Sequence, residues 1–234
     1  MPLLNLPAIE TSLRELQRAF PQINKELSDR RDPLDDEVLE NMLDGYVLVD
    51  RLIGAGIDIF AMGQLHHWLD LNAIVLCGCD AAVRTSHHRL MEATESRFYE
   101  EPNGGIRDIM DWYDLHRGRN VWRRATGVFI RMLSDPQLFI EGNHRTGALV
   151  MSYLLAREGR PPFVLTANNA REFFDPSSVI KKTKKRSMSM RLNMPGLGRA
   201  FAAYLERQAN PAFLLSTPAA PTAKGGVPVA TSPE

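Results

Sequence analysis

The fold of this chain is decided by one short stretch, Phe139-Ile140-Glu141-Gly142-Asn143-His144-Arg145-Thr146-Gly147, a polar turn between two apolar helical patterns. Before the turn, residues 121–134 place a set of apolar side chains on one face of a helix: Val121, Trp122, Ala125, Val128, Phe129, Met132 and Leu133. After it, residues 146–157 are apolar nearly all round, which is typical of a helix buried in the middle of a bundle. The two patterns predict a helix pair joined by this turn, within an all-α fold.

Helical periodicity extends over most of the chain. The predicted helices cover residues 8–29, as one or two helices interrupted at Pro21, and residues 35–54, 60–76, 106–116, 168–175 and 195–208. Residues 77–106 are less regular. The turn residues Glu101-Pro102-Asn103-Gly104-Gly105 predict a short β-hairpin around them.

The composition excludes several classes of protein. The 234 residues carry a formal net charge of zero, so a strong global field toward nucleic acid is absent. Cys77 and Cys79 are too close together for a routine disulfide. The start lacks the basic region and apolar core of a signal peptide, and no window of ~18 apolar residues predicts a membrane span. We therefore expect a cytoplasmic protein with no membrane partner.

The polar turn carries groups that bind phosphate and a metal ion. Gly142 and Asn143 reach unusual backbone angles, so the loop can wrap an anion, and the free N–H groups of the following helix start attract phosphate. Arg145 can grip a phosphate with its planar guanidinium, and Glu141 can bind a magnesium ion that bridges phosphate oxygens. The alternative is a plain helix start, with Asn143 as N-cap, Glu141 as a helix-end acceptor and Arg145 in a salt bridge within the bundle.

The same stretch resembles the motif of the Fic/Doc (Fido) family, H-P-F-x-D/E-G-N-G-R-x-x-R. The matching positions hold Phe139, Glu141, Gly142, Asn143 and Arg145. The flanking helices also look like that family's core, and the hairpin expected at 96–105 lies where the family carries its target-binding flap. The resemblance implies a Fido-like helical bundle with a small β-hairpin flap. It covers residues 60–208 as a Fido-like domain, which leaves an N-terminal helical segment at residues 1–59. We expect residues 209–234 to form a disordered tail, because the chain from Ser216 on is rich in Pro, Ala, Thr and Gly with almost no apolar bulk.

The resemblance also implies a function, the transfer of AMP from ATP to a hydroxyl group of a protein target. Mg²⁺ would be held by Glu141. The phosphates would lie on Gly142, Asn143, His144, Arg145, Thr146 and Gly147. Three departures from the motif matter. Gln137 stands at the position of the catalytic histidine, and glutamine cannot accept and carry a proton near neutral pH. Ala148 replaces the last arginine, and His144 replaces the mid-loop glycine.

These departures leave several interpretations open. The chain is a transferase weakened by the loss of its histidine, a variant transferase with another base, or an inactive module that binds a nucleotide or a protein partner as a regulator. A scaffold whose loop is purely structural is a further alternative. His144 is the obvious substitute base, although an imidazole that only fills space or hydrogen-bonds the loop is the simpler interpretation. The family's autoinhibitory element is matched only in part, by Thr11 and Glu15, and Ala148 cannot pair with its glutamate.

Two other patterns suggest binding sites of a different kind. His66-His67, Cys77-x-Cys79 and His87-His88 suggest zinc, but the cysteine spacing is unusual for a structural zinc site, and adjacent histidines on a helix should not face a common point. We favour partly buried cysteines and surface histidines. The run Lys181–Arg186 is densely basic but lacks interleaved aromatic residues, so we favour a solvated loop and do not expect a nucleic-acid partner.

Overall fold

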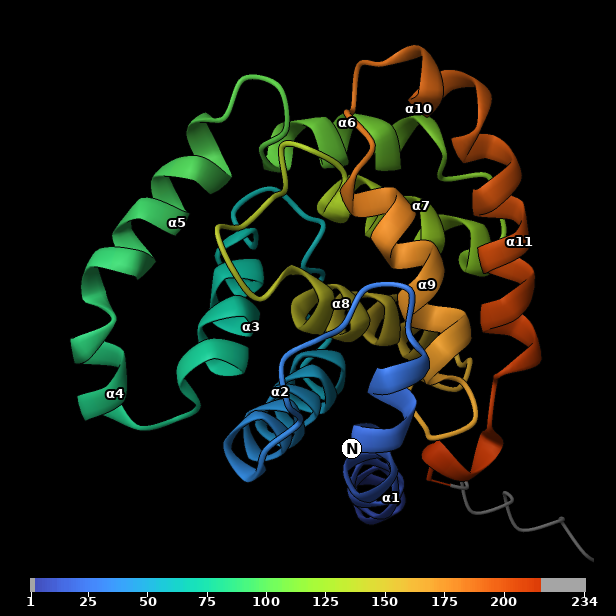
Figure 1. Ribbon diagram of the computed structural model, residues 1–234. Coiled ribbons are helices and arrows are strands. Elements are labelled where there is room, and N and C mark those ends of the chain that lie inside the picture. Colours follow the sequence, from blue (N-terminus) through green and yellow to red (C-terminus); the bar gives the residue numbers. More distant parts are fainter. Residues whose placement is uncertain (1–2, 216–234) are drawn as a thin grey trace, which may run out of the picture.

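The computed structural model describes residues 3–215, and these residues form an all-α fold, as predicted (Figure 1). No β-sheet is present among them; the predicted tail from Ser216 onward lies outside the described residues. The helices are α1 (Leu6–Glu26), α2 (Asp36–Gly54), α3 (His66–Cys77), α4 (Ala81–Ser86), α5 (His88–Glu100), α6 (Ile106–Leu115), α7 (Val121–Leu133), α8 (Asn143–Arg157), α9 (Ala170–Lys181), α10 (Met188–Leu192), α11 (Met194–Arg207) and the short 3₁₀ helix η1 (Pro211–Phe213).

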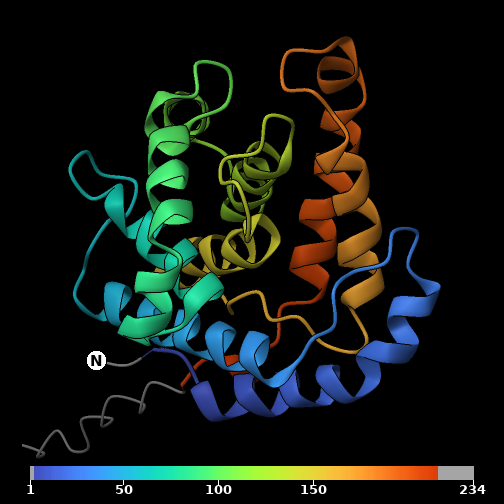
Figure 2. The same cartoon turned by 60° about the vertical axis from the view of Figure 1, so that its left-hand side comes forward.

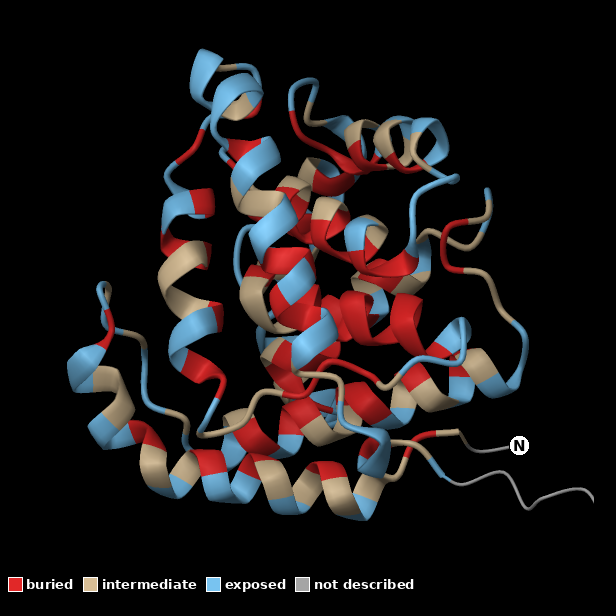
Figure 3. Cartoon of the chain, turned by 90° about the vertical axis from the view of Figure 1, so that its right-hand side faces the viewer, coloured by how far each residue is buried: buried red, intermediate tan, exposed pale blue. Residues whose placement is uncertain are grey.

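Helix α8 occupies the centre of the bundle. Every residue from Thr146 to Ala156 is buried, and Figure 3 shows this helix buried along nearly its whole length. It packs against α2, α3 and α7. The prediction of a central helix is confirmed, because a helix that is apolar on all sides is stable only where other helices surround it.

Helix α7 packs against α8, α9 and α11. The Phe129 ring lies 5.3 Å from that of Phe173 on α9 and 5.4 Å from that of Phe201 on α11. Gly147 permits the close approach of α8, because a Cβ atom added there would lie 2.7 Å from the Phe129 ring. The turn between α7 and α8 is therefore fixed by packing at both of its ends.

The N-terminal segment joins the same core as the rest of the chain. Leu4 and Ile9 belong to one cluster of buried side chains with residues of α7, α8 and α11. Figure 2 shows α1 and α2 side by side along one edge of the molecule. The expected interruption of α1 at Pro21 is wrong, since the helix runs through this residue. Burial of its apolar face, including Phe20, holds the helix together across the missing N–H group.

The predicted β-hairpin flap is wrong. Residues 88–100 form α5, and the turn after α5 leads directly into α6. The N–H of Gly105 donates to the carbonyl of Glu101 at 3.0 Å, which closes the turn between these two helices. Turn residues such as Pro, Asn and Gly favour a change of direction but do not specify whether a helix or a strand comes next.

Other boundaries also differ from the expectations. Helix α3 begins at His66 rather than at residue 60, and α9 continues past Pro176 to Lys181. Residues 209–215, which we assigned to the disordered tail, are ordered: η1 buries Phe213, and the N–H of Asn5 donates to the Phe213 carbonyl at 2.9 Å. The buried Phe213 side chain and the hydrogen bonds to residues 3–5 together tie this end of the chain to the N-terminal segment.

Candidate anion-binding site

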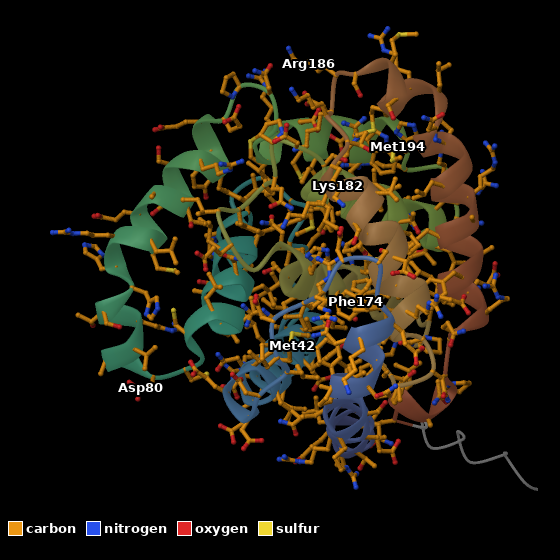
Figure 4. The ribbon with its side chains drawn as sticks, in the orientation of Figure 1. Met42, Asp80, Phe174, Lys182, Arg186 and Met194 are labelled. Atoms are coloured by element: carbon orange, nitrogen blue, oxygen red, sulfur yellow. The ribbon has the colours of Figure 1, made fainter. Side chains whose placement is uncertain are left out.

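A cavity of about 650 Å³ opens at the start of α8, a size typical of small-molecule sites. Apolar side chains from α1, α2 and α9 form much of its wall, among them Met42 and Phe174, both labelled in Figure 4. The polar residues that line it are Arg30, Arg31, Asp32, Gln137, Glu141, Asn143, His144, Arg145 and Lys181. The structure thus brings the predicted turn together with cationic residues from two distant segments.

Gly142 forms the bend that leads into α8. Its φ of +74° lies in the left-handed region, which favours glycine. A Cβ atom at this position would also lie 2.8 Å from Nδ2 of Asn72 on α3. That nitrogen donates to the carbonyl of Glu141 at 3.0 Å and to the Thr146 hydroxyl at 3.1 Å. The bend is therefore held from outside by a buried amide, and Thr146 serves as one of its anchors.

The expected N-cap role of Asn143 is wrong, because Gly142 is the N-cap and Asn143 is the first helical residue. The buried Asn143 side chain turns back instead. Its Oδ1 accepts from the N–H of Phe139 at 2.9 Å, and its Nδ2 donates to the Phe139 carbonyl at 2.8 Å. No side chain caps α8, and within residues 3–215 the N–H groups of Asn143, His144 and Arg145 have no hydrogen-bond acceptor. These N–H groups are suited to an anion.

His144 is largely buried beside α9. Its ring lies 6.4 Å from that of Phe173 and 6.3 Å from that of Phe174, and its Nε2 is buried with no hydrogen-bond partner among the described residues. Burial lowers the pKa of His144 to about 3, and the charges of Arg31 and Lys181 act in the same direction. The imidazole is therefore neutral at physiological pH.

Arg145 lines the cavity but directs its hydrogen bond into the bundle. Its Nη1 donates to the carbonyl of Val75 on α3. Burial lowers its pKa, against the opposing effects of Asp32 and Glu141. The expected alternative, a salt bridge, is not formed within the described residues; the partner is a backbone carbonyl instead. Arg145 thus fastens the start of α8 to α3.

Three further motif positions, Gln137, Glu141 and Ala148, have different surroundings. Gln137 Nε2 donates to the carbonyl of Leu133 at 3.2 Å, and its own backbone carbonyl accepts from Arg97 Nε at 2.8 Å. Glu141 is exposed and forms no ion pair with the residues that the structure describes. Ala148 is buried and lines the cavity.

Arg31 was not singled out in the sequence, although it is a central cation of the cavity. Its Nη2 donates to Ser178 Oγ at 2.6 Å and to the Phe174 carbonyl at 3.3 Å. Its Nε is buried and has no partner in the described part of the chain. The adjacent Arg30-Arg31 pair in a predicted loop was a weak signal, because only tertiary packing brings α9 and the α8 start to it.

The His and Cys pairs, for which we favoured surface histidines and partly buried cysteines over zinc ligands, and the basic run have different outcomes. His66 and His67 do face a common point, against expectation: with Asp70 their ligand atoms lie within 4.8 Å of one another, and His67 Nδ1 lies 3.0 Å from Asp70 Oδ2. Cys77 is buried, Cys79 is exposed and both are free. Within the basic run, Lys185 is buried, which corrects the expectation of a wholly solvated loop.

No protein-family model, curated protein or solved structure matches this chain. Among the described helices, none combines the length and the apolar character that a bilayer crossing requires. The resemblance to the Fic/Doc family therefore rests on the residues of the turn and its flanking helices.

Proposed function

We propose that this chain is a Fido-like module that binds the phosphates of a nucleotide at the start of α8, with transfer activity that is weakened or lost. The observation that carries the proposal is the cavity at this helix start. Three residues whose N–H groups have no acceptor in residues 3–215 line it, together with the cations Arg31 and Lys181. A helix N-terminus with positive side chains nearby stabilises phosphate both through its N–H groups and through its dipole.

The cationic contact differs from the one that the motif suggests. Arg145 donates through Nη1 to the Val75 carbonyl, and Arg31 donates through Nη2 to Ser178 and the Phe174 carbonyl. The exposed Lys181 is therefore the lining cation best placed to meet the charge of a phosphate. The Nε of Arg31 is buried and has no partner in the described residues, so this guanidinium, which lines the cavity, keeps an unsatisfied donor. The apolar wall from α1, α2 and α9 offers a surface for the base and ribose.

The residues fit a magnesium ion bound together with the nucleotide. Mg²⁺ usually takes one or two carboxylates along with phosphate oxygens and water. Glu141 is an exposed carboxylate in the cavity wall and is free of ion pairs in the described residues. When bound, the ion would neutralise charge on the phosphates.

The groups around the turn support binding better than transfer. Gln137 donates to the Leu133 carbonyl and has no basic atom. His144 is a poor substitute base, because its pKa of about 3 leaves it little affinity for a proton and its Nε2 is buried. One observation still favours the second candidate, a weak nucleotidyltransferase: the exposed Glu141 has the chemistry to hold the metal ion that such a reaction needs.

Isothermal titration calorimetry with ATP tests the binding proposal. Lys181→Gln and Arg31→Gln should each weaken ATP binding by roughly tenfold, because each removes one charged contact to a phosphate. Glu141→Gln should remove the part of the affinity that depends on Mg²⁺ and leave binding in EDTA unchanged. Arg89→Gln, an exposed substitution on α5, is the control. Wild-type protein that gives no heat with ATP, with or without Mg²⁺, would exclude the proposal.

Transfer activity is measured separately with ATP labelled at the α-phosphate, Mg²⁺ and a cell lysate. Label on protein that is lost with Glu141→Gln but kept with the control Glu95→Gln would support the transferase. ATP binding without labelling of any protein would support the nucleotide-binding module and exclude the transferase.

A further inference from the structure

We propose that a second cavity, between α6, α7, α10 and α11, binds a small polyanion that carries two or more phosphate groups. This cavity has a volume of about 500 Å³ and shares no lining residue with the cavity at the start of α8. Met194, labelled in Figure 4, marks its place at the beginning of α11.

Cationic side chains surround the cavity without any acidic residue in its lining. They are Arg119, Arg123, Arg131, Lys185, Arg191 and Arg199. Among the residues that the structure describes, only Arg131 has an acidic partner, through hydrogen bonds of 2.9 and 3.0 Å to the carboxylate of Asp108. The other four arginines form no ion pair within the described residues. Although the formal net charge of the chain is zero, these clustered cations create a local field that attracts an anion.

Two buried polar groups in the wall indicate a ligand in addition to the surface charge. Thr126 on α7 is 1% exposed, and its hydroxyl has no hydrogen-bond partner among the described residues. Buried hydroxyl groups are normally paired, so this one marks an unsatisfied polar group in a residue that lines the cavity. Lys185 is 7% exposed, and its Nζ donates to the carbonyl of Gly104 at 2.7 Å. An ammonium group has two further donors, which a ligand in the cavity can accept.

The surroundings of Lys185 disfavour its positive charge while the cavity holds no anion. Burial lowers its pKa to about 8; Arg131 and Arg97 act in the same direction, while Asp108 and Glu101 oppose it. A bound polyanion adds negative charge beside this group and reverses the effect. Binding above about pH 8 should therefore take up a proton.

The floor of the cavity is a rigid aromatic surface. The Trp112 ring stacks on His116 with centroids 4.3 Å apart, and the Arg131 guanidinium lies 5.6 Å from the Trp112 ring centroid. Trp112 lies directly on α7, because Gly127 has no side chain: a Cβ there would lie 1.8 Å from Trp112 Cη2. This packing gives the cavity a fixed floor and an intrinsic fluorescent reporter.

The arrangement of charge favours a small ligand over nucleic acid. The cations converge on one cavity from several helices rather than follow a stripe along one face, and neutral overall charge gives no long-range attraction for a nucleic-acid backbone. Five of the six cations are arginines, whose planar groups bind phosphate oxygens in pairs.

Titration with inorganic tripolyphosphate, followed by calorimetry and by tryptophan fluorescence, tests the proposal. The double variant Arg123→Ser and Arg199→Ser should lose roughly tenfold or more in affinity, since two charged contacts are removed. Both side chains are exposed, so the variant should fold, and circular dichroism checks this. Arg89→Ser is the matched control. Lys181→Gln weakens phosphate binding at the start of α8 and should leave the fluorescence response of Trp112 intact.

The outcomes separate this proposal from the nucleotide site. Unchanged tripolyphosphate affinity and fluorescence in the double variant would overturn it, whatever ATP does at the start of α8. Loss of the fluorescence response with Lys181→Gln alone would also overturn it, because the anion would then bind at the first cavity. Tighter binding of a single-stranded oligonucleotide than of tripolyphosphate, abolished by the double variant, would replace the small ligand with nucleic acid.

Discussion

His144 should make this protein less stable as the pH falls, in addition to the effect of its carboxylates. Its folded-state pKa of about 3 lies below its ordinary value of 6.5, because it is buried and faces Arg31 and Lys181. The folded state therefore binds fewer protons than the unfolded state between these two values. The contribution of neutral His144 to stability is fully present above pH 6.5 and is lost as the pH falls toward 3.

The size of the effect is set by the two pKa values. A shift from 6.5 to about 3 corresponds to a loss of roughly 2 kcal/mol of unfolding free energy between pH 7 and pH 5, and to roughly 3 kcal/mol by pH 4. Protonated carboxylates add their own acid effect, so the relevant quantity is a difference between proteins. His144→Gln and His144→Phe both lack the titrating group, and the second also keeps an aromatic ring near Phe174.

Urea denaturation monitored by circular dichroism at pH 7, 6, 5 and 4 measures this difference. The stability of wild type relative to each variant should fall by roughly 2 kcal/mol between pH 7 and pH 5. Direct NMR titration of the His144 ring gives an independent check. A relative stability that stays constant over this range, or a ring that titrates near 6.5, would refute the reasoning. ATP bound at the start of α8 would raise the pKa of His144 and reduce the loss.

Three further outcomes are expected. Gly142→Ala should lower the unfolding free energy by roughly 2 kcal/mol or more, since a Cβ would lie 2.8 Å from a buried amide. Gly56→Ala, at φ +69° with open space around it, should lower it by only about 1 kcal/mol. Equal losses in urea denaturation would contradict the close contact. Gly127→Ala should displace Trp112, shift its fluorescence and weaken tripolyphosphate binding; an unchanged spectrum would argue against the packed floor. The unfolding free energy of wild type should rise by about 3 kcal/mol between pH 8 and pH 10.5, because burial lowers the folded-state pKa of Lys185 from 10.5 to about 8. Lys185→Met should lack this rise. Parallel curves of stability against pH for the two proteins would oppose this.

Local sequence patterns predicted the helices well where a helix has an apolar face or is apolar on all sides. The helix pair α7 and α8 and the buried centre at α8 were predictable from periodicity alone, because such faces must be covered. The hairpin at residues 101–105 failed, since turn residues do not encode the structure on either side of them. The continuation of α1 through Pro21 was also unpredictable, because it depends on burial of Phe20 and its neighbours.

The sequence predicted the position of the candidate site but not which side chains face the cavity. Glycine at position 142 and the carboxylate at 141 are local properties, and both lie where the turn was expected. The inward hydrogen bond of Arg145 could not be foreseen, because its acceptor is the carbonyl of Val75, far away in the sequence on α3.

The sequence by itself determined an all-α chain with an anion-friendly turn before a central helix. Only the tertiary structure decided which cations face that turn, and that the basic run divides between two cavities, with Lys181 lining one and Lys185 the other. The reason is physical: periodicity and turn chemistry act over a few residues, whereas charge convergence and burial depend on which helices pack together.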